Sequence, residues 1–335
     1  MKLSFIFSSK NEYEGMKKYR VFSIFNLKFR FRISMFKTLR RSRPKLLNNL
    51  RDYDNILKNK NEQRQKCELA ICAIYKNEPD IKEWIEYHRL IGIDRFYLYD
   101  NDSDDNSREI LKPYIENGIV VYKYVSGRCM QVPVYRDAVF RYKNETKWLA
   151  IIDLDEYIVP VSTNNLKDFL KEYDKYPAVG VNWLMFDSNG LVKRPNKPVI
   201  EAYTRCDYNF PSNKMIKSIV KPNKVLSITD PHFCYYRKKL LAVDENFKEL
   251  KPDSNGGNYS VNTEMPMNKI RINHYHTKSQ EDWERKMGIG FADSTKIREH
   301  SPGHLVFDRY DSDDTILKYL PQLKKNMNME MEIKK

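Results

Sequence analysis

The sequence predicts an α/β protein with a mostly parallel sheet that is flanked by helices and followed by a less regular second half. Apolar runs typical of buried strands alternate with segments of helical periodicity through residues 69–152, and polar side chains follow three of these runs directly. Hydrophobic residues make up 41% of the 335 residues. That share supplies enough apolar surface for a sizeable core and excludes a wholly disordered chain.

The first 66 residues differ from the rest of the chain in charge. They hold 18 Lys and Arg against five acids, a net charge of +13, whereas residues 67–335 carry only +1 of the total of +14. This basic arm favours anionic partners, either a membrane surface or nucleic acid. Because the body is nearly neutral, we expect no nucleic acid to bind.

The arm has a pattern suited to a membrane surface. Residues 17–43 interleave bases with aromatic and aliphatic residues, and Leu27–Ile33 alternates strictly, as a strand does. Each base close to an anionic bilayer contributes about 1 kcal/mol. Peripheral membrane contact and a solvated leader both remain open, and residues 44–66 are typical of a helix or linker.

Three observations predict a cytoplasmic protein, with peripheral contact at the inner face of the membrane as a further expectation. The apolar run at the start covers only five residues, which is too short for a signal peptide. No stretch reaches the length of about 18 apolar residues that a spanning helix needs. The five cysteines form no C-x-x-C pair, which suits a reducing compartment.

Strand and helix alternate through the first half of the body. A buried strand over 69–75 is followed by a turn and by a helix with apolar positions at 81, 84, 85 and 88. A second strand covers 96–99, and a helix runs from Ser107, a capping residue, to Gly118.

The alternation continues to residue 152. A third strand covers 119–125, a helix covers 135–142, and a fourth strand covers 148–152. Intervals of this length suit right-handed crossovers between parallel strands.

The second half is less regular. It contains a helix over 166–173, strands over 178–186 and 269–275, and a helix that begins with residues 282–287. The proline-containing stretch 187–262 is predicted to be rich in loops, and no strand is predicted within it. The predicted division is an arm and linker over 1–66, a body over 67–300, and a helical or flexible tail over 301–335.

Two aspartates just beyond the fourth strand give the strongest chemical signal. Asp153 and Asp155 are one residue apart where Ile152 ends a buried strand. Ligands of parallel sheets bind beyond the carboxyl ends of the strands, and carboxylate oxygens suit Mg²⁺ or Mn²⁺. The pattern therefore predicts a divalent cation that would neutralise a bound diphosphate.

Other polar residues are predicted at the same edge. Asn77 and Glu78 follow the first strand, and Asp100 and Asn101, which could hydrogen-bond a nucleotide base or ribose, follow the second. Residues 100–111 imitate a calcium loop but lack its glycine at position six and its glutamate at position twelve, which excludes an EF-hand.

A late histidine pair is the remaining candidate. His274 and His276 lie on one face of a predicted strand, and a histidine near Asp155 could complete a metal site, with Lys278 neutralising a phosphate. One packed and one exposed histidine is the alternative. The chain has no P-loop, no G-x-G-x-x-G and no G-x-S-x-G, so P-loop enzymes, dinucleotide oxidoreductases and α/β-hydrolases lose support.

Eight segments, in consistent order over about residues 67–290, resemble glycosyltransferase family 92 and its bacterial relatives related to family 2. They are AICAIYKNE (70–78), WIEYHRLIGI (84–93), YLYDNDS (97–103), WLAIIDLDEYIVP (148–160), VNWLMF (181–186), KSIVKP (217–222), DPH (230–232) and NHYHTKS (273–279). The resemblance implies a GT-A type, Rossmann-like fold with an irregular acceptor-side half. It also implies a nucleotide-sugar donor, usually a UDP-sugar, a Mn²⁺ or Mg²⁺ ion, a glycan or lipid-linked acceptor, and inversion at the anomeric carbon.

The resemblance also implies residue roles. Asp153, Asp155 and His274 match the metal site, and Lys278 would face the diphosphate. Ala73, Lys76, Asn77, Glu78 and Asp100 match the nucleotide-binding edge, and Arg136 lies where related enzymes often meet the nucleotide. The expected catalytic base is Asp187, although family members commonly carry glycine there, and Glu201, Asp207 and Asp230 remain open.

Two other functions were weighed. A nucleotidyltransferase of similar fold would show a glycine-rich basic loop after the first strand, whereas residues 76–79 contain an acid and no glycine. A nucleic-acid-binding protein built around the arm is the weakest reading. The sequence therefore favours a glycosyltransferase.

Overall fold

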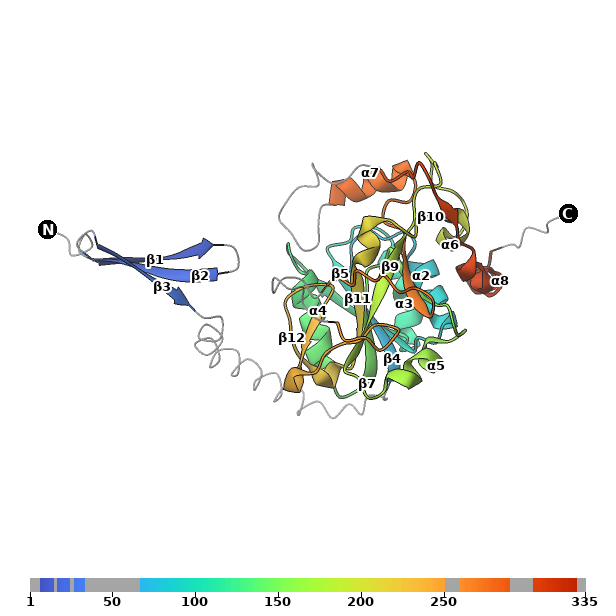
Figure 1. Ribbon diagram of the computed structural model, residues 1–335. Coiled ribbons are helices and arrows are strands. Elements are labelled where there is room, and N and C mark those ends of the chain that lie inside the picture. Colours follow the sequence, from blue (N-terminus) through green and yellow to red (C-terminus); the bar gives the residue numbers. More distant parts are fainter. Residues whose placement is uncertain are drawn as a thin grey trace. The chain divides into compact units, whose positions relative to one another are not determined.

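The computed structural model describes residues 7–14, 17–24, 27–33, 67–250, 260–289 and 304–329, the first three ranges by their backbone. The chain forms two compact units that divide near residue 65 (Figure 1), and each is described by itself. In the first unit β1 (Phe7–Glu14), β2 (Lys17–Ile24) and β3 (Leu27–Ile33) pair in that order as an antiparallel sheet. The stretch that alternates strictly in the sequence is β3.

The second unit is built on one eight-stranded sheet. Its strands, from edge to edge, are β6 (Val120–Val125), β5 (Arg95–Asn101), β4 (Cys67–Tyr75), β7 (Thr146–Ile151), β11 (Ile216–Val220), β9 (Ala178–Met185), β14 (Ile270–His274) and β8 (Glu156–Pro160). The first four are mutually parallel, as are β9 and β14, whereas β11 and β8 run antiparallel to their neighbours.

Three helices make the crossovers between the parallel strands: α2 (Ile81–Leu90), α3 (Ser107–Glu116) and α4 (Gln131–Arg141). Alternate residues of β4 are buried in two different apolar cores, Leu69 and Ile71 in one, Ala70 and Cys72 in the other. A strand covered on both faces reads as a continuous apolar run, which is why the sequence displays it so clearly. The predicted α/β class with a mostly parallel sheet is confirmed.

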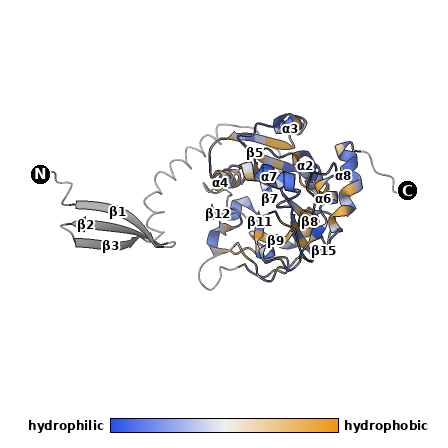
Figure 2. Cartoon of the chain, turned by 90° about the horizontal axis from the view of Figure 1, so that it is seen from above, coloured by the Kyte–Doolittle hydropathy of each residue, from blue (hydrophilic) through white to orange (hydrophobic). Residues whose placement is uncertain are grey.

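Shorter elements complete the unit. They are α5 (Leu166–Leu170), η2 (Lys171–Tyr173), α6 (Val199–Ala202), β10 (Arg205–Cys206), η3 (Pro211–Lys214), η4 (Pro222–Lys224), β12 (Val225–Ile228), β13 (Cys234–Tyr236), η5 (Arg237–Lys239), α7 (Gln280–Ile289), β15 (Asp311–Ser312), η7 (Thr315–Tyr319) and α8 (Leu320–Met327). Figure 2 shows α7 as largely hydrophilic, which suits a helix on the outside of the unit.

The loop prediction for 187–262 is wrong at β11, which lies near the middle of the sheet. The polar residues Lys217 and Ser218 concealed this strand, because each is buried on a distant partner. Lys217 meets Asp153 at 2.7 Å, and the Ser218 hydroxyl donates to the His232 carbonyl at 2.8 Å.

Residues 304–329 pack on the body. β15 pairs with β10. The Arg271 guanidinium meets Asp313 at 2.5 Å, and Asn326 Nδ2 donates to Glu86 Oε2 on α2 at 3.0 Å. Over the described residues the predicted tail is therefore part of the second unit. No helix in the described ranges is both long and apolar enough to cross a membrane.

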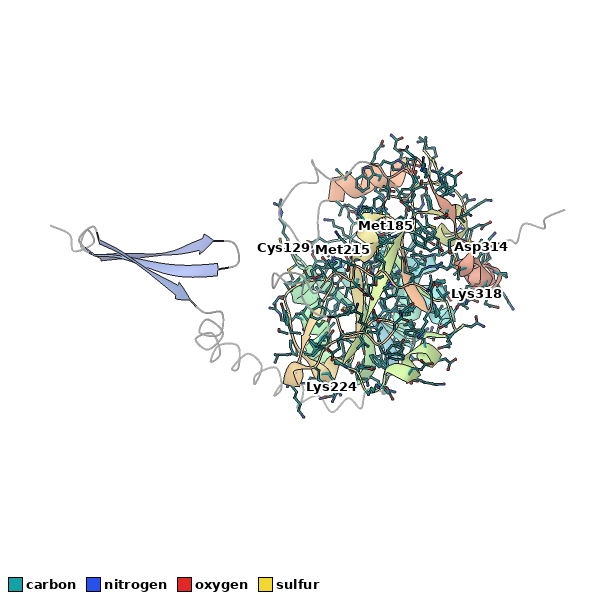
Figure 3. All side chains as sticks on the ribbon, in the orientation of Figure 1. Cys129, Met185, Met215, Lys224, Asp314 and Lys318 are labelled. Carbon is teal, nitrogen blue, oxygen red and sulfur yellow. The ribbon has the colours of Figure 1, made fainter. Side chains whose placement is uncertain are left out.

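The carboxyl ends of β4, β5, β7 and β9 meet at one edge of the sheet. Figure 3 places Met185, at the end of β9, and Met215, just before the antiparallel β11, toward the same end of the body, with Lys224 toward the other. Parallel sheets bind their ligands outside this edge, so the site should be assembled from the loops that leave these strands.

Candidate active site

Asp153 lies in a turn between β7 and β8 and is held by a buried network. Its Oδ2 meets Lys217 Nζ at 2.7 Å, and its Oδ1 accepts from the Tyr135 hydroxyl at 2.6 Å and from Gln131 Nε2 at 2.8 Å. Burial alone would raise the pKa of Asp153, but the Lys217 ammonium outweighs it and holds that pKa below its usual value. Both oxygens are thus already occupied by protein donors.

Glu156 closes the same turn. Its Oε2 accepts from the Asp153 amide at 3.0 Å, and its Oε1 lies 3.6 Å from Lys217 Nζ. Its side chain is fully buried, and burial raises its pKa well above the usual range. Lys217 therefore compensates the ionised Asp153, while the buried Glu156 favours its protonated form.

Asp155 points into a different network. Its Oδ2 lies 2.5 Å from Lys286 Nζ on α7 and 3.5 Å from His274 Nε2 at the end of β14. Burial would raise the pKa of Asp155, yet Lys286 and then His274 hold it well below its ordinary value. This carboxylate is ionised over the whole physiological pH range.

Asp155, His274 and His276 form a possible metal site. Each offers one ligand atom, and these atoms all lie within 4.8 Å of one another. His274 packs its ring on Trp183 at a centroid distance of 4.3 Å, and its buried Nδ1 has no hydrogen-bond partner within the described ranges. One carboxylate and two imidazoles fit a divalent transition metal, and they suit Mn²⁺ better than Mg²⁺, which prefers oxygen ligands.

Lys278 belongs to a buried ion-pair cluster that joins α7 to the loop after β4. Its ammonium contacts Asp80, which the Arg194 guanidinium also contacts, and Arg194 reaches Asp282 at 2.7 Å. Burial would lower the pKa of Lys278, but Asp80 raises it. Asp80 itself has its pKa lowered to about 2, because the two cations outweigh its burial.

The loops after β4 and β5 are pinned to each other. The Asn77 amide donates to Ser103 Oγ at 3.0 Å, and its side chain exchanges two hydrogen bonds with Asp104 at 2.7 and 2.9 Å. Asn77 holds a left-handed backbone with a φ of 53°, a conformation that asparagine tolerates better than most residues. The two loops therefore present one continuous edge beside Asp155.

Comparison with known proteins identifies the family. The model of glycosyltransferase family 92 matches residues 66–305, which is well over half of the chain. The chain belongs to glycosyltransferase family 92. The mixed α/β sheet described above agrees with the fold class that the sequence predicted.

Two curated relatives and one solved structure illustrate the similarity. A family 92 protein of Oryza sativa is 30% identical over 170 residues, covering 49% of this chain and 29% of that protein. Galactan beta-1,4-galactosyltransferase GALS3 of Arabidopsis thaliana is 30% identical over 196 residues, covering 52% and 38%. Crystalline S. aureus TarS shares 14% identity at a TM-score of 0.29, covering 46% and 28%. The chain thus matches about a third of the length of these curated relatives.

The other residues predicted for the nucleotide-binding edge differ in burial and in their hydrogen-bond partners. Asp100 is buried and accepts from the Ser103 amide at 2.9 Å and the Tyr122 hydroxyl at 2.8 Å, while Asn101 donates to the Gly127 carbonyl at 3.0 Å. Ala73 is wholly buried within β4 and offers the site no exposed atom.

Three more of the predicted residues lie around this edge. Lys76 and Glu78 are partly exposed in the loop after β4, and burial raises the pKa of Glu78. Arg136 is exposed on α4 and donates to the Ile228 carbonyl at 3.0 Å. Arg136 thereby links the nucleotide side to the segment that precedes Asp230.

Asp187 lies in a closed environment. Its Oδ1 accepts from the Asn189 amide at 2.7 Å, its Oδ2 accepts from the Phe307 amide at 2.8 Å, and Arg205 pairs with it at 2.8 Å. Its side chain is fully buried. These contacts join three segments of the chain and leave the carboxylate no open oxygen, so its role as the base stays a prediction with little support from its surroundings.

Three cations of the candidate site, Lys217, Lys286 and Arg194, are not singled out by the sequence. Lys217 lies with three apolar residues in the pentapeptide Ile216–Val220, and a lysine among apolar residues is a signal that a buried charge needs a partner. His276 is one of the two imidazoles predicted to be able to complete a metal site, although only His274 is assigned to it. Lys286 and Arg194 lie in polar stretches that carry no signal of their own.

Proposed function

We propose that this family 92 enzyme transfers a hexose from a nucleotide-sugar donor, a UDP-sugar by preference, to a glycan or lipid-linked acceptor in a Mn²⁺-dependent, inverting reaction. The observation that carries the proposal is the Asp155, His274 and His276 cluster at the carboxyl edge of the sheet. The similarity to a protein named galactan beta-1,4-galactosyltransferase supports a sugar chain as the acceptor and galactose among the candidate sugars.

The donor would lie across the pinned loops after β4 and β5. Backbone groups and the partly exposed side chains there would bind the nucleotide. His274 and His276 would hold the cation together with Asp155, and a bound Mn²⁺ would neutralise charge on the departing diphosphate. Lys278 would add positive potential through its position behind Asp80 rather than by direct contact with a phosphate, because its ammonium is already paired.

Asp230 is a better candidate than Asp187 for the base that deprotonates the acceptor hydroxyl. Among the described residues, the His232 amide and Ser260 Oγ both donate to Asp230 Oδ1 at 2.8 Å, and no donor to Oδ2 is found there, so Oδ2 could take a further proton. The His232 ring packs on Trp183 at 5.2 Å, and the other neighbour of Trp183 is the ligand His274. This chain of contacts links the acceptor side to the metal site.

The proposed base defines the chemistry. As Asp230 takes the hydroxyl proton, the acceptor oxygen forms a bond to the anomeric carbon and the bond to the diphosphate breaks on the opposite face. We expect Asp230→Asn to lower kcat about a hundredfold or more while UDP affinity and Tm change little. A kcat within threefold of wild type would remove Asp230 from this role.

Thermal-shift measurements test the class of the enzyme. UDP with Mn²⁺ should raise the Tm, and UDP without a divalent ion should raise it less. Asp155→Asn should abolish the metal-dependent part, whereas Asp168→Asn, which alters an exposed carboxylate on α5, should preserve it. A metal-independent response to UDP would contradict the metal site, and no response to any nucleotide sugar would contradict the class.

We further propose that the arm holds the enzyme at the inner, anionic face of a membrane. The arm carries most of the net charge of the chain. Full-length protein should sediment with phosphatidylserine vesicles and less with phosphatidylcholine vesicles. Replacing Lys28, Arg30 and Arg32 with glutamate should abolish the difference. Equal binding of that variant, or stronger binding to random DNA than to vesicles, would contradict the assignment.

A further inference from the structure

We propose that the Lys286 ammonium and a divalent metal compete for Asp155 and His276. Once the metal is bound, the Lys286 ammonium turns to the donor diphosphate. The competition rests on geometry alone, whereas the turn toward the diphosphate rests on the proposed function. Lys286 would thus be a positioning residue on α7.

Lys286 contacts two of the three residues that would hold the metal. Its Nζ lies 2.5 Å from Asp155 Oδ2, 2.8 Å from the His276 carbonyl and 3.4 Å from His276 Nδ1. Divalent cations sit about 2 Å from such ligands, so a metal bound to Asp155 and His276 would lie within contact distance of this ammonium. Two positive charges at that separation repel strongly, and the two states exclude each other.

Lys286 is less buried than the other lysines near the site. The side chains of Lys217 and Lys278 are 1% and 6% exposed. Lys286 is 21% exposed and pairs with Asp155. A flexible four-carbon stem lets its ammonium move while the helix backbone stays in place.

The helix itself is held independently of Lys286. Trp283 is buried, and Ser279 caps the first turn through a reciprocal pair of hydrogen bonds with Asp282 at 2.8 and 3.1 Å. Arg285, the preceding residue, donates to the Asn77 carbonyl at 2.6 Å. The end of α7 is therefore fastened beside the loop after β4, and release of the ammonium needs no movement of the helix.

The direction in which Lys286 can turn is toward that loop. Glu78, partly exposed there, interacts electrostatically with both Asp155 and Lys286. An ammonium displaced from Asp155 thus remains between the metal site and the nucleotide edge, where a diphosphate on the metal would lie. Lysine is well suited to this task, because its point charge binds phosphate without a fixed geometry.

If Lys286 and the metal exclude each other, the substitution Lys286→Met should change the affinities for Mn²⁺ and for UDP in opposite directions. Isothermal titration of Mn²⁺ into full-length Lys286→Met, without nucleotide, should show about tenfold tighter binding than wild type. Titration of UDP at saturating Mn²⁺ should show about fivefold weaker binding. A variant that had merely lost structure would weaken both, so opposite signs separate the proposal from damage to the fold.

Two further variants serve as controls. Arg285→Met removes the same charge from the same helix without touching the metal ligands, and its Mn²⁺ affinity should stay within about twofold of wild type. Lys286→Arg keeps a cation, and its Mn²⁺ affinity should stay at or below that of wild type. If Arg285→Met raised the Mn²⁺ affinity as much as Lys286→Met, the loss of any positive charge on α7 would explain the effect, and the proposed competition would be refuted.

The outcomes distinguish the two halves of the inference. Unchanged or weaker Mn²⁺ binding by Lys286→Met overturns the competition. If Lys286→Met binds Mn²⁺ more tightly but binds UDP as wild type does, the Lys286 ammonium does not turn toward the diphosphate. If wild type binds Mn²⁺ but no UDP, the nucleotide donor of the proposed function fails, while the Mn²⁺ comparison still decides whether Lys286 and the metal exclude each other.

Discussion

Removing Lys217 should destabilise the second unit more than any exposed ion pair can. Lys217→Met keeps most of the buried stem and deletes the charge, which leaves the ionised Asp153 without its cation beside the fully buried Glu156. The change therefore isolates electrostatics from packing.

The magnitude follows from the distance. At 2.7 Å the attraction between Lys217 and the ionised Asp153 amounts to about 6 kcal/mol at an effective dielectric constant near 20, before the cost of removing the charges from water. Breaking a buried pair by deleting one partner costs about 3–5 kcal/mol net. We expect a loss in this range, which is a large part of the stability of about 5–15 kcal/mol typical of folded proteins.

Urea denaturation followed by circular dichroism measures the effect. With a slope of about 3 kcal/mol per molar urea, the midpoint should fall by about 1–1.7 M. Lys171→Met is the matched control, because its ion pair with Asp168 is 72% and 58% exposed and its loss should cost at most about 0.5 kcal/mol.

A second substitution identifies the source of the loss. Adding Asp153→Asn to Lys217→Met removes the uncompensated carboxylate charge, while the new amide oxygen can still accept from the Tyr135 hydroxyl and from Gln131 Nε2. About half of the lost stability should return. A loss below 1 kcal/mol for Lys217→Met, or no recovery in the double variant, would refute the view that this cation stabilises the turn after β7.

Three further predictions concern other parts of the molecule. His88 is buried between the Trp84 carbonyl and the Ile158 amide, and burial lowers its pKa from 6.5 to about 3, so the free energy of unfolding should fall as the pH decreases through this window. The slope should approach 1.4 kcal/mol per pH unit in urea titrations, with a flatter profile for His88→Gln. Gly180→Ala would bring a Cβ within 2.4 Å of Leu250 Cδ1, at a cost of about 1 kcal/mol that Leu250→Ala should relieve in a double-mutant cycle. Asp187→Asn should lower the Tm, because the Arg205 pair weakens, and leave kcat within about tenfold; a normal Tm with a collapsed kcat would restore Asp187 as the base.

The sequence predicted the parallel strands because each is buried on both faces and reads as an apolar run. It missed β11, whose Lys217 and Ser218 look like surface residues until their partners are known. It also missed β8, five residues that follow the acidic turn directly. In both strands, long-range contacts decide the structure and local preference does not.

The site could be predicted in part for the same physical reason. Asp153 and Asp155 follow a strand whose end is fixed by the topology, and His274 ends another. The cations that divide the two aspartates between separate networks cannot be read from local sequence, since Lys217 lies 64 positions from Asp153 and Lys286 lies 131 positions from Asp155. Asp153 and Asp155 are separated by one residue, yet their side chains belong to different networks, so this spacing alone does not show that they bind the same metal ion.

The segment that matches the family is shorter than the unit that folds. The family match ends at residue 305, yet Asp313 compensates Arg271 inside the sheet, and Lys324 on α8 pairs with Glu201 at 2.7 Å. A chain shortened to the match would bury a guanidinium without its counter-ion and uncover one side of α2. The described residues beyond the family match are therefore part of the folded second unit and contribute to its stability.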